Sequence, residues 1–311
     1  MTDRIWILGA PDPEMEMIEN ILRQCGEQII YATDKDGRRV HPGNAYRCPV
    51  PEVPEGATVY AVECIDVLPD GWVRIDHHRP GDPGYGRPSH KFLRASSIGC
   101  LTVYLAIFDM LPESWIRPNS PEVDPGVIDY VEGAWRIGGK SAVYTAPQEV
   151  VFAAAADHCL AAAYRGECPG VNPDALMRWR IETRAAYQGR TVAELLADVE
   201  LARDLLEDAP NERIAHGVYV ADMRGYGHVP ELPEAALREG VAYITIVIDR
   251  DGRCKVVLGG HTTPEMVRAF LDTWAPSQGL TDLYGDPARG FAGGYLPQHN
   301  SPWGWGDTED A

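Results

Sequence analysis

Short apolar runs alternate with helix-like patterns along the first half of the chain. The runs have the length of buried strands, and they lie at residues 5–8, 28–32, 58–63 and 72–76. Apolar side chains at helical spacing predict a helix over 14–23, and similar patterns cover 97–109 and 148–165. Strands interleaved with helices in this way predict an α/β fold with a doubly wound, mostly parallel sheet.

The second half of the chain predicts a separate and smaller α/β domain. Pro-Gly-Val-Asn-Pro at 169–173 interrupts the chain, and a helical pattern, broken near Gly189, then runs to about residue 208. We therefore expect a first domain over 1–170, a helical connector over 171–210 and a second domain over 211–311. The elements expected in the second domain are strands at 217–221, 242–248 and 254–258, a helix at 263–274 and a loosely ordered tail from about 296.

Composition narrows the classes of partner. There are 28 lysines and arginines against 46 aspartates and glutamates, a net charge of −18, which argues against a grip on long duplex nucleic acid. No run of apolar residues is long enough for a membrane span, and the N-terminus lacks the pattern of a secretion signal, so we expect a cytoplasmic protein without membrane partners. Seven cysteines without a Cys-x-x-Cys pair favour neither a disulfide framework nor a zinc ribbon.

Carboxylates and histidines stand where the predicted strands end. Asp76, His77 and His78 directly follow the fourth strand, and this mixture of ligands suits Mn²⁺ or Zn²⁺. Asp12 and Glu14 follow the first strand, and Glu63 ends the third. The carboxyl ends of parallel strands meet at one edge of a sheet, where ligands bind. The alternatives are an acidic helix start, favoured by the helix dipole, and solvated turn residues.

A further carboxylate and histidine lie inside an apolar, helix-prone stretch. Asp157 and His158 follow four alanines, and charged groups in such surroundings are seldom left unpaired. A metal ion would pair them. A buried histidine with a salt-bridged aspartate is the alternative.

Taken in order, these segments resemble the motifs of the DHH phosphoesterases, the superfamily of RecJ-like exonucleases, nano-RNases and family II pyrophosphatases. That family follows its first strand with His-x-x-x-Asp-x-Asp, then has an acid at a strand end, Asp-His-His and a later aspartate. Asp12 and Glu14 correspond to the first motif, Glu63 to the second, Asp76-His77-His78 to the third and Asp157 to the fourth. The segment 285–294 resembles the glycine-rich motif of the associated substrate domain, with Ala292-Gly293-Gly294 matching and Arg289 in place of histidine.

The chain departs from the family pattern at several positions. Leu8 stands where the first-motif histidine is expected, Glu14 and Glu63 replace aspartates, and the interval from Glu63 to Asp76 is short. These departures leave open whether one metal ion or two would bind.

The resemblance implies a metal-dependent hydrolase. It assigns metal ligation to Asp12, Glu14, Glu63, Asp76, His77 and Asp157, catalytic contacts to Asp76, His77 and His78, and an outer position to His158. It assigns substrate binding to His261, Arg289, Gly293 and Gly294. The implied cofactor is one or two ions of Mn²⁺, or else Mg²⁺ or Zn²⁺. The implied substrate is a small nucleotide or short oligonucleotide, and a homodimer is possible.

Two rival interpretations stay open at the level of sequence. In one, the fold is kept but the altered metal site has lapsed, which leaves a nucleotide-binding protein. In the other, an unrelated α/β enzyme carries Asp-His-His by chance. Clustering of Asp12, Asp76 and Asp157 in space would argue against the second rival.

Overall fold

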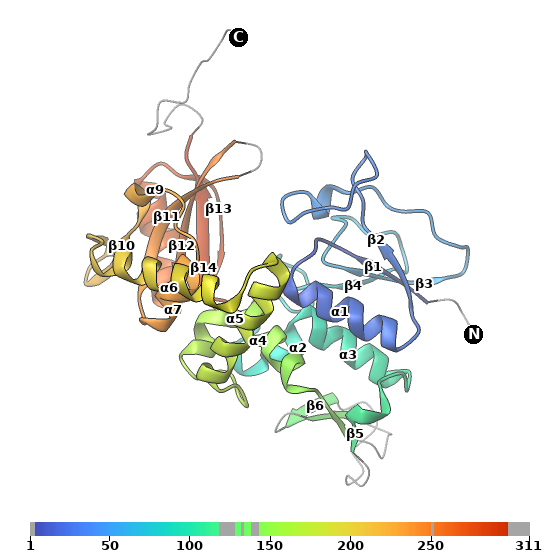
Figure 1. Cartoon of the computed structure of the whole chain (residues 1–311). Helices are drawn as coiled ribbons and strands as arrows, with labels where there is room; N and C mark the ends of the chain where they lie inside the picture. The colour runs from blue at the N-terminus through green and yellow to red at the C-terminus, as the bar shows by residue number, and fades with distance from the viewer. Residues whose placement is uncertain (1–3, 118–127, 132–133, 138–142, 250–251, 298–311) are drawn as a thin grey trace. The chain divides into compact units, whose positions relative to one another are not determined.

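The computed structural model describes residues 4–117, 128–131, 134–137, 143–249 and 252–297 (Figure 1). The chain divides into two compact units. The first contains residues 1–158 and 168–184, and the second contains 159–167 and 185–311. The chain thus crosses between the units three times, at 158, 167 and 184. The domain limits expected at 170 and 210 stay predictions, and the tail beyond 297 lies outside the described residues.

A parallel sheet of four strands forms the base of the first unit. Its order is β2 (Gln28–Tyr31), β1 (Arg4–Leu8), β3 (Thr58–Val62) and β4 (Val73–Ile75), and all neighbours run parallel. The four strands coincide with the four apolar runs of the sequence. Their carboxyl ends lie at one edge of the sheet, which places the segments after Leu8, Val62 and Ile75 close together.

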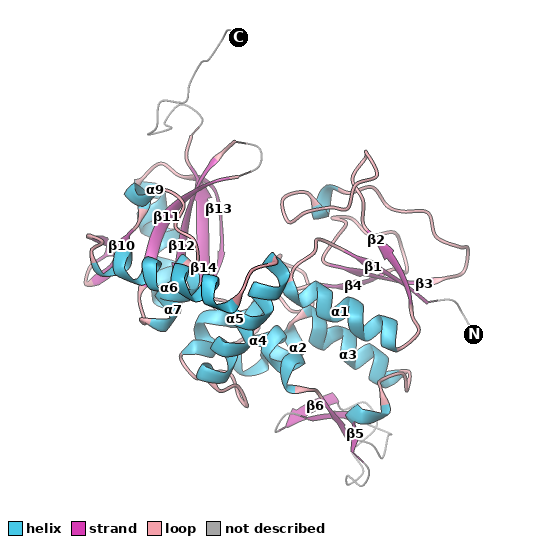
Figure 2. Ribbon diagram, viewed as in Figure 1, coloured by secondary structure: helices cyan, strands magenta, loops and turns pink. Residues whose placement is uncertain are grey.

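The two faces of this sheet are covered differently. On one face Trp6 stacks on Tyr60, which makes an edge contact with Tyr104 of helix α3 (Ser97–Ile107). Helix α1 (Pro13–Gln24) packs beside α3, and both lie along the same side of the sheet (Figure 2). On the other face Ile7 and Ala61 join an apolar cluster contributed by loop residues 32–72. Helices were expected on both faces, but in the described part of the chain loops replace them on one, because the connection from β2 to β3 carries no long helix.

The rest of the first unit consists of helices and a small antiparallel sheet. Helix α2 (Phe92–Ala95) precedes α3. Helices α4 (Gln148–Tyr164) and α5 (Pro173–Gln188) follow, and the last residues of each, from 159 and from 185, belong to the second unit. The small sheet contains β5 (Ile116–Arg117), β8 (Val143–Thr145), β7 (Ala134–Ile137) and β6 (Ile128–Val131), in that order. No strands were predicted from the sequence in this region. Helix α4 is kinked at Cys159, where the backbone is not helical (φ −154°, ψ 49°), directly after His158.

The second unit is built on a mixed sheet of six strands. Its order is β13 (Thr281–Asp286), β14 (Phe291–Tyr295), β12 (Cys254–Gly260), β11 (Ala242–Ile248), β10 (Val218–Asp222) and β9 (Asn211–Ala215). Only the β10–β11 pair is parallel. One face packs on α8 (Pro264–Ala269), a π-helical turn (Phe270–Trp274) and α9 (Ala275–Ser277), which bury Phe270 and Trp274. The remaining helices are α6 (Val192–Glu207) and α7 (Leu232–Arg238).

The second unit contains strands that were not predicted. No strand was expected after residue 274, but β13 and β14 continue the sheet to Tyr295. The glycine-rich run 285–294 belongs to these strands and the turn between them. Glycines weaken strand patterns in sequence, which is why β14 was not predicted. Among the described helices, none combines the length and the apolar character needed to cross a membrane.

Candidate metal centre

Four of the residues singled out from the sequence meet at the carboxyl edge of the parallel sheet. Glu63, His77, His78 and Asp157 each offer one ligand atom, and these atoms all lie within 4.8 Å of one another. His77 Nε2 lies 2.7 Å from Asp157 Oδ2 and 3.7 Å from Glu63 Oε1. A cation with bonds of about 2.1 Å holds opposite ligand atoms about 4.2 Å apart, so small side-chain shifts close the set around one ion.

Glu63 reaches the cluster through an unusual backbone conformation. Its φ is +50°, a left-handed value that costs a non-glycine residue about 1–3 kcal/mol and is concentrated at functional sites. Gly9 permits this turn, because a Cβ atom at position 9 would lie 2.4 Å from the carbonyl oxygen of Glu63. The strain is therefore maintained by the neighbouring strand, and it turns a carboxylate inward at the strand end.

His77 is oriented by a chain of hydrogen bonds that also fixes its tautomer. Nε2 of His158 lies 3.2 Å from the carbonyl oxygen of Arg87, which can only accept, so this nitrogen donates. Neutral His158 then accepts at Nδ1 from Nδ1 of His77, 3.1 Å away. His77 consequently carries its lone pair on Nε2, the atom that lies beside Asp157 and Glu63. Partners of this kind commonly orient metal-ligating histidines.

Asp157 and His158 lie in the last regular turn of α4 before its kink at Cys159. Both histidine rings of this contact are fully buried, with His77 and His158 each 0% exposed. The ring centroids of His77 and His158 lie 5.1 Å apart. Helix α4 thus places Asp157 in the cluster and His158 behind it, against His77.

Asp12 and Glu14 approach the same cluster from the start of α1. Asp12 caps the helix by accepting from the amide of Met15 at 2.7 Å, and Glu14 accepts from the amide of Ile98 at 3.0 Å. Burial and the charge of Asp157 raise the pKa of Asp12 to about 6. Burial, Asp157 and Glu63 raise the pKa of Glu14 well above its ordinary value. Both carboxylates therefore lie within electrostatic reach of the cluster, although neither belongs to the four-residue set.

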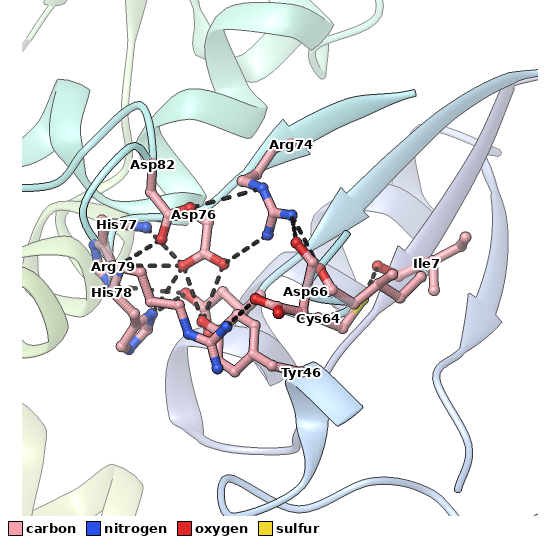
Figure 3. Close-up of polar contacts among 12 residues, drawn as sticks. Ile7, Tyr46, Cys64, Asp66, Arg74, Asp76, His77, His78, Arg79 and Asp82 are labelled. Atoms are coloured by element: carbon pink, nitrogen blue, oxygen red, sulfur yellow. Dashed lines mark hydrogen bonds and ion pairs between the residues drawn. The ribbon is translucent and has the colours of Figure 1, made fainter. Parts of the chain in front are cut away.

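Asp76 lies at the centre of a different set of contacts (Figure 3). Its Oδ1 accepts from the amides of His77 and His78, at 2.7 and 3.1 Å, and lies 3.1 Å from Nδ1 of His78. The hydroxyl of Tyr46 lies 3.1 and 3.0 Å from its two oxygens, and Arg74 Nη1 is 3.7 Å from Oδ2. Burial alone would raise the pKa of Asp76, but these hydrogen bonds hold it below the ordinary value. The contacts favour an orienting role, and ligation of a metal by Asp76 stays a prediction.

The electrostatics of the site fit a divalent cation. Burial raises the pKa of Glu63 to about 8, with repulsion from Asp157 and Asp12 adding to the rise and the positive charge of His78 opposing it. Oε2 of Glu14 and Oε1 of Glu63 are buried and accept no hydrogen bond from the described residues. No lysine or arginine of the described chain forms an ion pair with Asp12, Glu14 or Glu63. Buried carboxylates without a cation are costly, and an ion bound among them removes that cost.

The predicted substrate-binding residues lie in the second unit. Arg289 is buried, with its guanidinium 5.0 Å from the centre of the Phe291 ring, and His261 is half-buried near Arg165. Gly293 and Gly294 face the side chains of Tyr284 and Leu283, which a Cβ atom would meet at 2.1 and 2.5 Å. Close packing within the sheet accounts for both glycines. A part for any of these four residues in substrate binding stays a prediction.

Three residues that support the site were not found by sequence reasoning. Tyr46 comes from a loop thirty positions before Asp76, and nothing in its surroundings marks it. Gly9 was identifiable only as a glycine after a strand. Gly84 packs between two backbones, since a Cβ atom there would lie 2.6 Å from Cβ of His77 and 1.8 Å from the carbonyl oxygen of Ala95. Glycine in the loop after Asp-His-His was the available signal for such a close approach.

Comparison with known proteins gives no relative from which a role could be transferred. No protein-family model matches this chain, and a search of curated proteins returns no match. The function of this chain therefore has to be inferred from its residues and their geometry.

Proposed function

We propose that this protein is a divalent-metal-dependent phosphoesterase of the DHH kind, acting on a small nucleotide or short oligonucleotide. One observation carries the proposal. Acidic and histidine residues from three distant segments, Glu63, His77-His78 and Asp157, gather at the carboxyl edge of a parallel sheet, and Asp12 from a fourth segment lies within electrostatic reach of them. Their order along the chain is the order of the DHH motifs.

Glu63, His77 and Asp157 would hold the ion, with Asp12 and Glu14 at hand for a second and His78 facing the substrate. The mixture of carboxylate and imidazole favours Mn²⁺ or Zn²⁺ over Ca²⁺. When bound, such an ion supplies Lewis-acid chemistry, neutralising phosphate oxygens and making water a better nucleophile. The residues of the chain supply the placement: Gly9 and the turn at Glu63 set one carboxylate, and His158 sets the tautomer of His77.

His78 is the member of the cluster best placed to touch a substrate. Its side chain is 34% exposed, whereas that of His77 is fully buried. With Nδ1 held by Asp76, its other ring nitrogen, Nε2, would contact a phosphate oxygen or give a proton to a leaving oxygen. Asp76 and Tyr46 would fix the orientation of the ring without touching the substrate. The net charge of −18 favours a short substrate over a long polymer.

A second candidate function is nucleotide binding without turnover. The observation that favours it is Leu8, which is fully buried where the family pattern has a metal-ligating histidine. With one ligand fewer, the site could hold an ion too weakly or in a geometry unsuited to hydrolysis.

The test is hydrolysis of a small panel by the intact chain with Mn²⁺: a dinucleotide, a cyclic dinucleotide, a bis-phosphorylated nucleoside and pyrophosphate. We expect turnover of at least one compound, loss of it in Asp157→Asn and retention in Asp222→Asn, which changes a carboxylate of the second unit. Equal turnover in Asp157→Asn would overturn the proposal. Bound Mn²⁺ and bound nucleotide without turnover would support the second candidate.

A further inference from the structure

A pocket of about 420 Å³ lies in the first unit, beside β4, and four cationic side chains line it. They are Arg74 of β4, Arg87 of the following loop, Lys91 at the end of the 3₁₀ turn Ser89–Lys91, and Arg94 of α2. None of the four belongs to the metal cluster. Such a concentration is unexpected in a chain of net charge −18. Between Asp82 and Asp109 the sequence contains no acidic residue at all, so the pocket is basic because acids are missing as well as because cations are present.

The opposite wall of the pocket is apolar and comes from one face of α3. Cys100, Val103, Tyr104 and Ile107 line it, and their spacing of three and four places them in one stripe along the helix. Ile107 is 39% exposed, which is high for a large apolar side chain. The pocket therefore combines a cationic wall with an aromatic and aliphatic one, and its volume falls in the range of small-molecule sites.

The cations differ in how far the protein already uses them. Arg74 donates to the carbonyl oxygens of Ile65 and Asp66, at 3.0 and 2.6 Å, and lies 3.7 Å from Asp82. Arg87 donates only a long bond of 3.4 Å to the carbonyl oxygen of Pro83, and within the described chain neither it nor Lys91 forms an ion pair. Arg74 is thus largely committed to structure, whereas Arg87 and Lys91 are available to an anion.

We propose that this basic pocket binds a phosphate-bearing small molecule with a flat or apolar group, as in a nucleoside monophosphate. The phosphate lies against Arg87 and Lys91, which form charge-assisted hydrogen bonds with it. The base packs against Tyr104 and Ile107 on α3. A dianion with an apolar part pairs with the cations and also covers the apolar face of α3. Inorganic phosphate would leave that face exposed to water, and a nucleoside without phosphate would leave the cations unpaired.

The basic pocket is a separate site that adjoins the metal centre. Arg74 lies 3.7 Å from both Asp82 and Asp76, and the carbonyl oxygen of Arg87 accepts from His158. In Figure 3 Arg74 and the two histidines lie on different sides of Asp76. The proposal concerns binding alone and does not depend on hydrolysis at the metal centre.

Calorimetric titration of the intact chain with adenosine 5′-monophosphate, in the presence of a chelator, tests the proposal. We expect saturable binding that is at least about tenfold tighter than that of adenosine or of inorganic phosphate. The double variant Arg87→Gln/Lys91→Gln should weaken it by at least about tenfold, since each cation contributes a charged hydrogen bond. Lys35→Gln/Arg38→Gln is the matched control, because both residues are exposed elsewhere in the same unit and the charge change is equal.

Three outcomes would overturn the proposal: no saturable binding by the wild type, an equal loss in the two double variants, or loss of binding in Asp157→Asn under the same chelated conditions. The last would place the nucleotide at the metal centre. Failure of hydrolysis in the substrate panel leaves these readings intact, so the two proposals fail separately. Melting temperatures of the double variants confirm that each is folded, and Ile107→Ala should weaken nucleotide binding but leave phosphate binding unchanged.

Discussion

Two groups of carboxylates in this protein differ in whether an arginine of the chain neutralises their charge. In the second unit Asp222, at the end of β10, accepts two hydrogen bonds of 2.7 Å from Arg224, which also reaches Glu212 at 3.1 Å. The hydrogen bonds from Arg224 lower the pKa of Asp222. In the first unit Asp12, Glu14 and Glu63 gather near Asp157. No lysine or arginine of the described chain forms an ion pair with these three carboxylates, and burial with repulsion from neighbouring carboxylates raises the pKa of each.

This difference indicates which of the two groups of carboxylates is suited to binding a metal ion. Glu212 and Asp222 are partly exposed and hold their own counter-ion, so nothing is gained by binding a metal there. Glu14 and Glu63 of the first unit are buried, and one oxygen of each accepts no hydrogen bond from the described residues. Buried carboxylates without a counter-ion destabilise the folded protein, and a bound divalent ion would remove this destabilisation.

Removing one carboxylate from each group should have opposite effects, and this is the largest difference we expect. Asp157→Asn removes a cause of the raised pKa values, so the metal-free protein should become more stable at pH 8, by on the order of 1 kcal/mol. It should also lose Mn²⁺ affinity by at least about 100-fold, since a ligand matters more than its outer partner. Asp222→Asn should lower the free energy of unfolding by roughly 1 kcal/mol, because it breaks a bidentate but half-exposed ion pair. It should leave the Mn²⁺ affinity of the protein unchanged.

Denaturant unfolding and calorimetric Mn²⁺ titration of both variants measure the two quantities. If Asp157→Asn and Asp222→Asn lowered metal-free stability alike and left Mn²⁺ affinity alike, the carboxylates of the first unit would be ordinary structural acids. The contrast between the two groups would then have no bearing on function.

The stability of the metal-free protein should fall as pH rises from about 4.5 to about 8. The pKa of Glu63 is raised from its ordinary value of 4.5 to about 8, so in this window the folded protein still holds a proton that the unfolded chain has released. Raising the pH therefore favours unfolding until Glu63 is ionised in both states. Asp12 adds the same effect between its ordinary value of 3.8 and about 6.

Mn²⁺ should reverse this trend, because it binds the ionised carboxylates and its affinity grows as protons leave. Thermal melts between pH 5 and 8.5, with and without Mn²⁺, should therefore separate most at the highest pH. Asp222→Asn should show the same separation as the wild type. A gap that is constant across the pH range would mean that the ion binds elsewhere.

His158→Ala should weaken Mn²⁺ binding by about 10–100-fold, although His158 is not in the four-residue cluster. The reason is the tautomer: without an acceptor beside Nδ1, His77 is no longer constrained to present its lone pair on Nε2. His158→Asn keeps an acceptor near that position and should lose less. Equal losses in the two variants, measured by calorimetry after a melting control, would point to packing instead of orientation.

Sequence patterns were sufficient for the part of the fold that positions this site. The four parallel strands coincide with the four apolar runs, because a strand buried on both faces must be apolar throughout. The loops that cover one face of the sheet, and strands β13 and β14, were not predicted. Val40 and Ala45 pack on the sheet as isolated residues without periodicity, and glycines hide the strand character of β14.

The candidate site could be predicted as a set of residues but not as a set of roles. Glu63, His77, His78 and Asp157 were all singled out, because carboxylates and histidines at strand ends are conspicuous. The contacts between these residues depend on side-chain directions, which a linear sequence pattern does not contain. The same holds for the contacts of Asp76 with Tyr46 and His78. Tyr46 in particular looks like any tyrosine of a polar loop.

Among the variants of the metal centre, Tyr46→Phe should have the smallest effect on Mn²⁺ affinity, and it tests whether orientation within the metal centre matters beyond charge. The substitution removes the hydroxyl that contacts both oxygens of Asp76 and leaves every carboxylate and histidine in place. A hydrogen bond to a buried carboxylate contributes about 1.5–3 kcal/mol, so the free energy of unfolding should fall by an amount in the lower part of that range. Asp76 would remain held by His78 and two amides, and Mn²⁺ affinity should change by less than in His158→Ala. Tyr219→Phe, at an exposed site in the second unit, is the control for loss of a hydroxyl. A larger loss of Mn²⁺ affinity in Tyr46→Phe than in His158→Ala would make Asp76, and not His158, the main support of the ligand set.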